Sequence, residues 1–324
     1  MINVAIVGYG NLGKGVSKAI QKTKDVNCVW IFTRRAPESI TPIFNENVYK
    51  IDELKNFKGQ IDVLLLCGGS ATDLPQTTAE YLKDFNTVDS FDNHAKIPEY
   101  FEKLDKVAKE NGKVCAISIG WDPGLFSICR ALFGAVLPDG NDYTFWGKGV
   151  SQGHSDAIRR IEGVKNAIQY TIPKEDALTS VRNGENPTLS ARDKHLRECF
   201  VVAKDGADKE RIEREIKSMP NYFEPYDTIV HFISEEELKE KHSKLAHGGF
   251  VLRSGKTSNE NSQLLEFSLK LDSNPEFTSS VLLAYARAVA RLAKEGRTGA
   301  MTVYDIPLKY LSSMTEEDMR KNLL

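Results

Sequence analysis

The feature that most constrains this chain is a glycine-rich turn between a strand-like run and a helix-like run. Ile2–Val7 is continuously apolar, which predicts a strand covered on both faces of a sheet. A G-x-G-x-x-G motif follows at once, and residues 13–22 have the pattern of a helix. In this setting the glycines allow a tight turn, close approach of a pyrophosphate and close packing of helix on strand. We therefore expect a dinucleotide to contact Gly8, Gly10, Asn11, Leu12 and Gly13; the alternative is a glycine-rich turn without a ligand.

Strand and helix patterns alternate over the first 120 residues. Further strands are predicted at residues 28–33, 61–67, 87–89 and 114–119, and a helix at residues 98–110. This alternation argues for a parallel sheet with helices on both faces. The predicted fold class is α/β, with a Rossmann-type doubly wound parallel sheet in a nucleotide-binding domain of residues 1–120.

The pattern changes after residue 120 to longer, alternating segments. Strands are predicted at residues 165–172, 195–203, 228–233, 249–253 and 263–271, and helices at residues 211–218 and after the capping-box sequence at residues 234–237. We expect an α+β domain of residues 121–274 with an open, mixed and mainly antiparallel sheet. A second subunit is a common way to cover one face of such a sheet, so a homodimer is expected.

The last fifty residues are expected to return to the first domain, from about residue 275 to 324. A strong helical pattern covers residues 278–295, and Gly296 stands at the expected end of that helix. Residues 301–306 read as a last strand, and residues 313–316 as the start of a short terminal helix.

Composition excludes several classes of protein. Lys and Arg number 43 against 45 Asp and Glu, for a net charge of −2, so there is no basic excess to bind a nucleic acid. Apolar runs are far shorter than the ~20 residues of a membrane span. The first residues lack the features of a signal peptide, so a cytoplasmic location is expected. The cysteines are odd in number, form no C-x-x-C pair and are expected to be reduced: Cys28, Cys67, Cys115, Cys129 and Cys199.

The end of the second predicted strand indicates which dinucleotide binds. Enzymes that use NAD carry Asp or Glu about twenty residues after the glycines, where the ribose hydroxyls lie. Here the strand ends in Thr33, Arg34 and Arg35. Two guanidinium groups and a hydroxyl suit a phosphate, so NADP is expected in place of NAD. The alternative is a solvated basic turn.

Small and acidic residues follow the next strands. Cys67, Gly68, Gly69 and Ser70 would let a flat ring lie against the backbone. Two later segments end in Asp92 and in Trp121-Asp122, and both are expected at the same edge of the sheet as the glycines. Two carboxylates and an indole suit an ammonium group. The alternative is that these acids only cap turns or helices.

Residues 141–156 are rich in aromatic, glycine and polar residues without periodicity, which favours a binding loop. His154 and Asp156 would fit a hydrolase, but no G-x-S-x-G motif accompanies them. The histidines have no metal-ligand spacing, so no metal is expected. His247 beside two glycines fits either an anion contact or a plain turn.

Together these motifs resemble one family, the NADP-dependent meso-diaminopimelate dehydrogenases, from residue 2 to past residue 274. The resemblance rests on Gly8-Tyr9-Gly10-Asn11-Leu12-Gly13, Thr33-Arg34-Arg35, Gly69-Ser70-Ala71-Thr72-Asp73, Asp92-Asn93-His94, Gly120-Trp121-Asp122-Pro123-Gly124, Phe145-Trp146-Gly147, Ser151-Gln152-Gly153-His154-Ser155-Asp156 and His247-Gly248-Gly249. It implies a homodimer that deaminates meso-2,6-diaminopimelate at its D-carbon, reversibly and oxidatively. The product, L-2-amino-6-oxopimelate, cyclises to tetrahydrodipicolinate in lysine biosynthesis.

The resemblance also assigns residues. Catalytic positions at the D-centre are Asp92, Asp122 and Trp121. Contacts to NADP fall on Gly8, Gly10, Asn11, Leu12, Gly13, Thr33, Arg34, Arg35, Cys67, Gly68, Gly69, Ser70, Ser90, Phe91, Asp92, Ile119, Gly120, Trp121, Asp122 and Pro123. The substrate is held by Asp92, Asp122, Trp146, Gln152, Gly153, Thr171, Arg197, His247 and Asn274, mostly at its distal L-amino-acid end.

These residues suit the chemistry. Asp92, Asp122 or a water between them would take the proton of the ammonium group, with His154 as a further candidate. Arg197 would clamp the distal carboxylate, so that only the D-carbon reaches the ring. Two alternatives are a reductase similar to dihydrodipicolinate reductase, which would need a basic catalytic pocket, and a non-catalytic NADP sensor, which would need neither Arg197 nor the acid pair.

Overall fold

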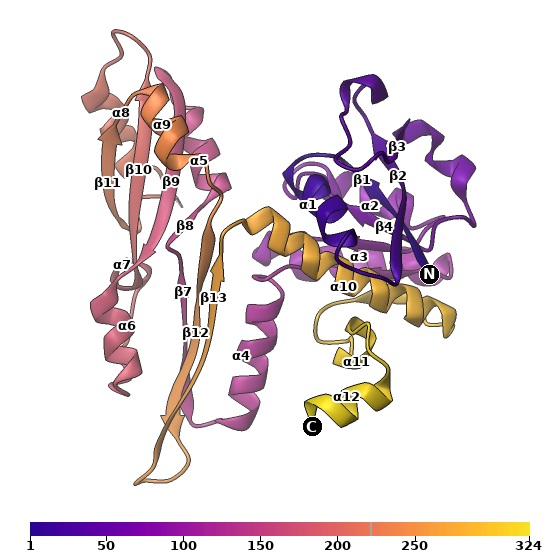
Figure 1. Ribbon diagram of the computed structural model, residues 1–324. Helices are drawn as coiled ribbons and strands as arrows, with labels where there is room; N and C mark the ends of the chain where they lie inside the picture. The colour runs from indigo at the N-terminus through magenta and orange to yellow at the C-terminus, as the bar shows by residue number, and fades with distance from the viewer. Residues whose placement is uncertain (221) are drawn as a thin grey trace. The chain divides into compact units, whose positions relative to one another are not determined.

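The computed structural model describes residues 1–220 and 222–324 (Figure 1). Contacts divide the chain into two compact units, which we call unit 1 (Met1–Ile128 and Pro275–Leu324) and unit 2 (Cys129–Asn274). Unit 2 is therefore an insertion in unit 1. The first division falls at Ile128, beyond the expected residue 120. Phe126 packs edge-on against Trp121, and the hydroxyl of Ser127 accepts a hydrogen bond from the amide of Gly124, so this stretch stays with unit 1.

Unit 1 contains a seven-stranded sheet in the order β14-β6-β5-β4-β1-β2-β3, and all neighbouring strands are parallel. The order turns back at β1, which places a ligand crevice at the carboxyl ends of β1 and β4. The predicted parallel sheet is confirmed, with one strand that the sequence did not reveal, β3. The strands are β1 (Ile2–Val7), β2 (Val26–Thr33), β3 (Asn47–Lys50), β4 (Val63–Leu66), β5 (Thr87–Asp89), β6 (Val114–Ala116) and β14 (Gly299–Met301).

Helices cover both faces of this sheet. One apolar cluster joins alternate strand residues to α1 (Asn11–Ile20) and to the long α10 (Asn274–Lys294). The other joins the opposite strand face to α2 (Leu74–Tyr81) and α3 (Ile97–Glu110). Short 3-10 helices lie at Pro37–Ser39, Ile51–Phe57 and His94–Lys96. The apolar runs that predicted the strands are therefore buried on both sides, which is the doubly wound arrangement.

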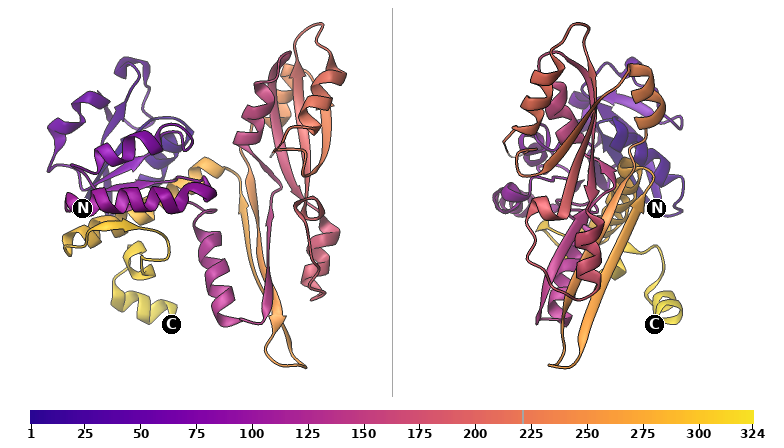
Figure 2. Two further views of the ribbon diagram at one scale, coloured as in Figure 1. Left: turned by 180° about the vertical axis from the view of Figure 1, so that it is seen from behind. Right: turned by 90° about the vertical axis from the view of Figure 1, so that its left-hand side faces the viewer.

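Unit 2 contains two sheets where the sequence predicted one open sheet (Figure 2). The four-stranded sheet has the order β11-β10-β9-β8 and is mixed, because β10 and β11 run parallel. The three-stranded sheet, β13-β12-β7, is antiparallel. Its strands are β7 (Gly140–Trp146), β12 (His247–Lys256) and β13 (Ser262–Leu271); the first sheet has β8 (Gly149–Val150), β9 (Val164–Pro173), β10 (His195–Ala203) and β11 (Asp227–Phe232).

Helices pack on each of these sheets. On the four-stranded sheet, α5 (Gln152–Arg159) and α8 (Lys209–Lys217) bury apolar side chains against β9 and β10. On the other sheet, α6 (Glu175–Arg182) buries Leu178 and Val181. The capping box predicted at Ser234 is confirmed in part, because its hydroxyl accepts the amide of Glu237 at 3.1 Å and opens α9 (Glu235–His242). The helix α4 (Leu125–Val136) crosses the division between the units, and the short α7 (Ala191–Lys194) precedes β10.

The predicted binding loop at residues 141–156 is wrong in three places, one of which is the short strand β8. Residues 140–146 form β7, and Gln152 begins the helix α5. The sequence signal for helix is weak there because serine, glycine and histidine have low helix propensity. Tertiary contacts decide the outcome, since the hydroxyl of Ser155 donates to the carbonyl of Ser151 at 2.7 Å and accepts the amide of Gln169 at 3.0 Å.

The end of the chain lies in unit 1, and its last strand comes earlier than predicted: β14 is Gly299–Met301 and shares only Met301 with the predicted residues 301–306. β14 stops at Met301, because the carboxylate of Asp305 accepts hydrogen bonds from the amide and the hydroxyl of Thr302, both at 2.8 Å, and closes a turn. The terminal helix is confirmed as α12 (Glu316–Leu323), with Thr315 as its cap. It follows the short α11 (Leu308–Leu311).

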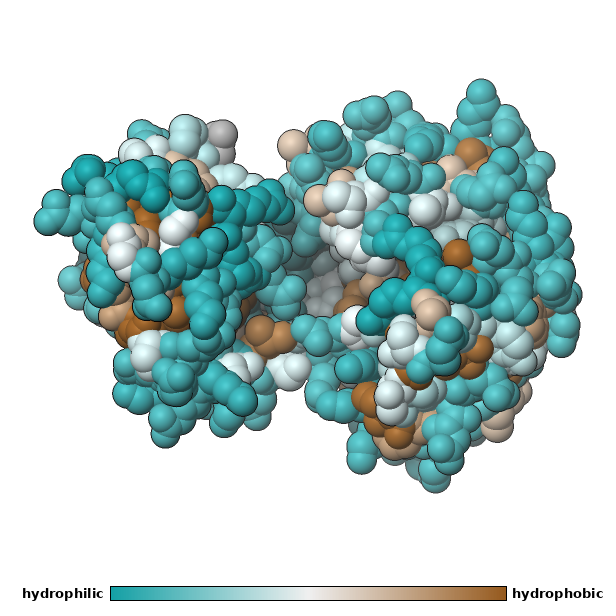
Figure 3. Space-filling view, turned by 90° about the horizontal axis from the view of Figure 1, so that it is seen from above, coloured by the Kyte–Doolittle hydropathy of each residue, from teal (hydrophilic) through white to brown (hydrophobic). Residues whose placement is uncertain are grey.

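The surface is predominantly hydrophilic on the face seen in Figure 3, where apolar residues form small separate patches. Among the helices of the described residues, none is long and apolar enough to cross a membrane.

Candidate active site

The three glycines after β1 meet three different requirements. Gly8 has a φ of +92°, a left-handed conformation that side chains disfavour. A Cβ on Gly13 would lie 2.3 Å from the carbonyl oxygen of Gly8, so the turn and α1 can pack this closely only with glycine there. A Cβ on Gly10 would meet no atom within 4 Å. The space beside Gly10 is open and can accept a ligand.

The first turn of α1 has backbone amides that can bind an anion. Its N-cap residue is Gly10, which supplies no side-chain hydrogen bond, and no acidic residue stands in the first turn. The amides at the start of a helix point outward and carry the positive end of its dipole. They therefore suit a pyrophosphate that approaches past Gly10.

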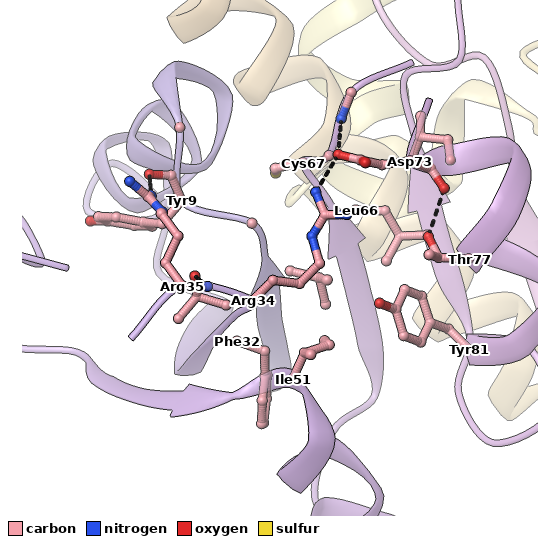
Figure 4. Close-up of a pocket in the computed structure, with 17 residues that line it drawn as sticks. Tyr9, Phe32, Arg34, Arg35, Ile51, Leu66, Cys67, Asp73, Thr77 and Tyr81 are labelled. Carbon is pink, nitrogen blue, oxygen red and sulfur yellow. Dashed lines mark hydrogen bonds and ion pairs between the residues drawn. The ribbon is translucent and has the colours of Figure 1, made fainter. Parts of the chain in front are cut away.

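A cavity of about 260 Å³ opens beside this turn, at the switch point of the sheet (Figure 4). Its walls come from the carboxyl ends of β1, β2 and β4, from the start of α2 and from the 3-10 helix after β3. The lining residues are Val7, Gly8, Tyr9, Gly10, Phe32, Thr33, Arg34, Arg35, Ile51, Leu66, Cys67, Gly68, Gly69, Asp73, Leu74, Thr77 and Tyr81.

The side chains of two consecutive arginines after β2 point to opposite sides of this cavity (Figure 4). Arg34 reaches across to the carboxylate of Asp73 at 2.8 Å, and 67% of its side chain is exposed. Arg35 donates to the carbonyl of Tyr9 at 2.9 Å, and its own amide donates to the hydroxyl of Thr33 at 3.1 Å. Both guanidinium groups keep further donors for a ligand, because each uses a single nitrogen in these contacts.

These contacts fit NADP. The cavity has open space next to a helix N-terminus and two guanidinium groups at its walls, that of Arg35 beside the glycine turn and that of Arg34 beside Asp73. The strand β2 ends in a hydroxyl and two cations where NAD enzymes have an acid. Asp73 stands in the Gly69–Asp73 motif, but its contact with Arg34 was not predicted. It lies 39 positions from Arg34, so no local spacing pointed to that pair.

The segments with the candidate acids leave neighbouring strands, β5 and β6, at the same edge. The fully buried Asp89 ties the two segments together. One of its oxygens accepts the amides of Phe91 at 3.0 Å and Ser118 at 3.1 Å, and the other accepts the hydroxyl of Tyr100 at 2.8 Å. Burial raises the pKa of Asp89 to about 6. Asp89 thus fixes the backbone from which Asp92 and Asp122 depart.

Asp92 is exposed and contacts the segment after β4. Its carboxylate accepts the hydroxyl of Ser70 at 2.5 Å, and its amide donates to the same hydroxyl at 2.9 Å. Trp121 is 8% exposed and forms a bridge with Gly124 that shapes the turn containing Asp122. That Asp92 and Asp122 act on one ammonium group stays a prediction.

Several predicted cofactor residues offer only backbone to a ligand. Phe91 is 2% exposed and stacks on Tyr100 with ring centroids 4.2 Å apart, and Ile119 is fully buried. Burial also raises the pKa of the Cys67 thiol far above its usual range, so that thiol stays protonated. Cys67 lines the cavity, whereas Phe91 and Ile119 are not among its lining residues, and a ligand beside their segments would meet backbone amides and carbonyls.

In unit 2, Arg197 is a buried cation with an unusual set of partners. It is 5% exposed, lies opposite Thr171 in the β9–β10 pair and donates to the Thr171 hydroxyl. Its guanidinium carbon lies 4.0 Å from the ring centroid of Tyr226. Its Nε has no hydrogen-bond partner, and no carboxylate within the described residues forms an ion pair with it. Burial lowers the pKa of Arg197.

Two histidines near this cation are held neutral. Burial and the charge of Arg197 lower the pKa of His154 to about 4 and that of His195 to about 3. His195 accepts the amide of Trp146 at 2.9 Å and stacks on its indole. His154 shares a hydrogen bond of 2.8 Å with the hydroxyl of Ser151. With a pKa near 4, His154 is a weak base at neutral pH.

The other predicted substrate residues lie at the ends of elements. Gln152 and Gly153 are exposed at the start of α5. His247 begins β12, and Gly149 packs so closely on its ring that a Cβ there would lie 2.3 Å away. Asn274 begins α10, and its amide donates to the carbonyl of Leu245 at 2.9 Å.

Comparison with known proteins identifies the family. The family model described as the diaminopimelic acid dehydrogenase C-terminal domain matches residues 120–273. The meso-diaminopimelate D-dehydrogenase of Ureibacillus thermosphaericus is 59% identical over 100% of this chain and 99% of the relative. The chain belongs to the meso-diaminopimelate D-dehydrogenase family. The member from Corynebacterium glutamicum is 45% identical over 98% of each chain.

Solved structures of this family agree with the fold. The C. glutamicum enzyme in complex with DAP has a TM-score of 0.93 and 44% identity, and covers 100% of this chain and 99% of its own. An engineered D-amino acid dehydrogenase bound to NADP+ has a TM-score of 0.88 and 42% identity, and covers 100% and 99%. The predicted α/β fold with its second α+β unit is that of the family.

Proposed function

We propose that this chain catalyses the reversible, NADP-dependent oxidative deamination of meso-2,6-diaminopimelate at its D-carbon. The reaction consumes NADP and one water, which adds to the imine left by hydride transfer and displaces ammonia. The products are NADPH, ammonia and L-2-amino-6-oxopimelate, which cyclises to tetrahydrodipicolinate, in the dehydrogenase route of lysine biosynthesis. The observation that carries the proposal is Arg197, a buried guanidinium without an acidic partner among the described residues. A buried charge needs a counter-charge, and a carboxylate of the substrate supplies one.

Unit 1 binds the cofactor. The open first turn of α1 takes the pyrophosphate, and Thr33, Arg34 and Arg35 take the ribose phosphate. When bound there, NADP accepts a hydride from the substrate carbon. The segments that follow β4, β5 and β6 would hold the nicotinamide end of the cofactor; they contain Cys67–Ser70, Ser90–Asp92 and Ile119–Pro123.

Asp92 and Asp122 act on the reacting amino group. The ammonium of the D-carbon must lose a proton before its lone pair can expel the hydride, and a carboxylate or a water that it orients accepts this proton. The hydrogen bonds from Ser70 hold Asp92 in place for this step. Trp121 supplies the apolar wall beside them. His154 is a poorer acceptor because of its low pKa.

Unit 2 recognises the distal L-amino-acid end. Arg197 and Thr171 bind the distal carboxylate, His247, Asn274, Gln152 and Gly153 add polar contacts, and Trp146 lines the substrate's chain. Such a clamp selects the D-carbon by orientation, because only the end that is not clamped reaches the ring.

The proposal extends to a cytoplasmic homodimer. Its support is α4, an apolar helix in which Leu132 and Val136 stay 55% and 59% exposed. Exposed apolar residues on a helix of this kind mark a surface for another chain. Five free thiols suit a reducing compartment.

The test is to mix the purified protein, NADP and meso-diaminopimelate at mildly alkaline pH and to follow NADPH by absorbance. The L,L-isomer and NAD are parallel controls. We expect turnover with the meso isomer and NADP alone. Turnover of the L,L-isomer would refute the D-carbon assignment, and NADP binding without any turnover would favour the sensor.

A further inference from the structure

The side chain of Gln169 belongs to the Arg197 cluster although the function proposed above does not use it. Gln169 lies on β9, two residues before Thr171, so both side chains point to the same face as Arg197. It is fully buried. Its Nε2 donates to the Thr171 hydroxyl at 3.5 Å, and its Oε1 has no partner.

The hydrogen bonds at the Thr171 hydroxyl fix the direction of its proton. A hydroxyl accepts at two lone pairs and donates one hydrogen. Thr171 Oγ1 accepts from Arg197 Nη1 and from Gln169 Nε2, so both lone pairs are used. Its hydrogen must therefore be donated to a third group.

We propose that Gln169 is a positioning residue that sets Thr171 as a hydrogen-bond donor toward the distal carboxylate of the substrate. The inference rests on the function proposed above. Without Gln169, Arg197 still donates to the hydroxyl, but one lone pair becomes free and the hydroxyl hydrogen can point in more than one direction. With it, Thr171 and Arg197 both present hydrogens to the same anion.

The contacts of Gln169 argue against a purely structural role for its side chain. An unpaired buried oxygen lowers stability, so an apolar side chain of the same length would serve a structural purpose better. The ordering of α5 also depends on the Gln169 backbone, whose carbonyl accepts the Ser151 amide at 3.0 Å and whose amide donates to Ser155 at 3.0 Å.

The first variant is Gln169→Met, which retains length and removes both polar atoms. We expect KM for meso-diaminopimelate to rise roughly tenfold, the lower end for a hydrogen bond to a charged group. We expect kcat and KM for NADP to stay at the native values, and Tm to stay or to rise. A fall in Tm with an unchanged KM would show a structural role and overturn the proposal.

The matched control is Gln263→Met. Gln263 also donates from Nε2 to a threonine hydroxyl, that of Thr257 at 3.2 Å, but on the exposed β12–β13 hairpin. We expect native KM and kcat for this control. An equal rise in KM in both variants would overturn the proposal.

A double-mutant cycle with Thr171→Val shows whether Gln169 acts through the hydroxyl. The tenfold effect of Gln169→Met should shrink to nearly nothing in the Thr171→Val background. The same factor in both backgrounds would overturn the positioning role while native turnover leaves the proposed function intact. Lack of native turnover with meso-diaminopimelate would instead refute the proposed function itself.

Discussion

Arg34 donates a hydrogen bond of 2.8 Å to Asp73, and the same carboxylate oxygen accepts the amide of Gly69 at 2.9 Å. The carboxylate is the anchored partner, because the Asp73 side chain is 23% exposed and that of Arg34 is 67% exposed. An exposed ion pair of this kind contributes little to stability. Its effect is to keep the guanidinium over the cavity before a phosphate arrives.

Arg34→Ala should weaken NADP binding by about 1.5–3 kcal/mol, the value of a hydrogen bond between charged groups, and should narrow the preference over NAD. Calorimetric titration with both cofactors measures this. The control is Lys58→Ala, since Lys58 pairs with Asp84 outside the cavity lining, and it should leave both affinities at native values. An unchanged preference in Arg34→Ala would contradict the cofactor assignment.

Alanine at Gly10 and at Gly13 should have opposite effects. Gly10→Ala puts a methyl group into open space, so Tm should stay within about 1 °C of native while NADP affinity falls through collision with the pyrophosphate. Gly13→Ala forces a contact of 2.3 Å with Gly8, and should lower the free energy of unfolding by about 1–3 kcal/mol. Thermal unfolding with and without NADP separates the two. A Gly10→Ala protein with native affinity would refute the pyrophosphate position.

Arg197→Ala should raise KM for meso-diaminopimelate by a factor on the order of 10–100, with little change in KM for NADP. The matched control is Arg182→Ala in the same unit. Arg182 also lies over an aromatic ring, Phe250 at 4.9 Å, but it has an acidic partner, Glu266. Steady-state kinetics decides, and an equal loss for substrate and cofactor in Arg197→Ala would rule out the distal clamp.

The ionisation of Asp89 should lower the free energy of unfolding as pH rises from about 4 to about 6. Its pKa is about 6 when folded and 3.8 as a free residue, so the folded state binds a proton more tightly in this window. Protonation therefore favours folding at low pH, and that contribution disappears above the folded pKa. Relative to Asp89→Asn, the native protein should lose on the order of 3 kcal/mol between pH 4 and pH 7.

Urea unfolding of both proteins at the two pH values measures this difference. Asparagine can accept the two backbone amides and donate to Tyr100, so the variant should fold. A constant difference in unfolding free energy between native protein and variant would show that Asp89 is ionised throughout.

Leu132→Glu should convert the proposed dimer to monomers, because a charge on the exposed apolar side of α4 cannot be buried against a second copy. Sedimentation of native and variant protein measures the mass. Leu308→Glu is the control, since Leu308 is 65% exposed on α11, at another place in the chain. A native protein that sediments as a monomer would contradict the homodimer.

The sequence predicted those parts of the fold whose cause is local. Ile2–Val7 and the glycines after it specify a strand, a turn and a helix within twenty residues, and His195–Ala203 shows its strand by composition alone. The fate of residues 152–159 depends on Ser155 bonding to Gln169 on another strand, which no local pattern reveals. The number of sheets in unit 2 was missed for the same reason. One sheet was expected, but β12 pairs with β7, far from it in the sequence, and this pairing forms a second sheet.

The candidate site shows the same limit. Thr33, Arg34 and Arg35 could be found because one short segment ends a strand beside a glycine turn. The roles of Asp73 and Gln169 could not be found, because each depends on a contact with a residue on another element. Asp73 contacts Arg34. Gln169 contacts the Thr171 hydroxyl, to which Arg197 on the neighbouring strand also donates. In the sequence, each is only a polar residue within a run of apolar or small residues. Such positions are common, so they do not indicate a functional residue.

The insertion of unit 2 has a consequence for how the protein is made. The edge strand β14 pairs with β6, and α10 completes one apolar cluster of the sheet, yet both are translated after all of residues 129–274. While the ribosome is still making these residues, the nucleotide-binding sheet lacks its last strand and one of its covering helices. Unit 2 has all its own strands by then, so it can fold first, whereas the apolar cluster that α10 completes in unit 1 can close only after residues 275–301 have been made.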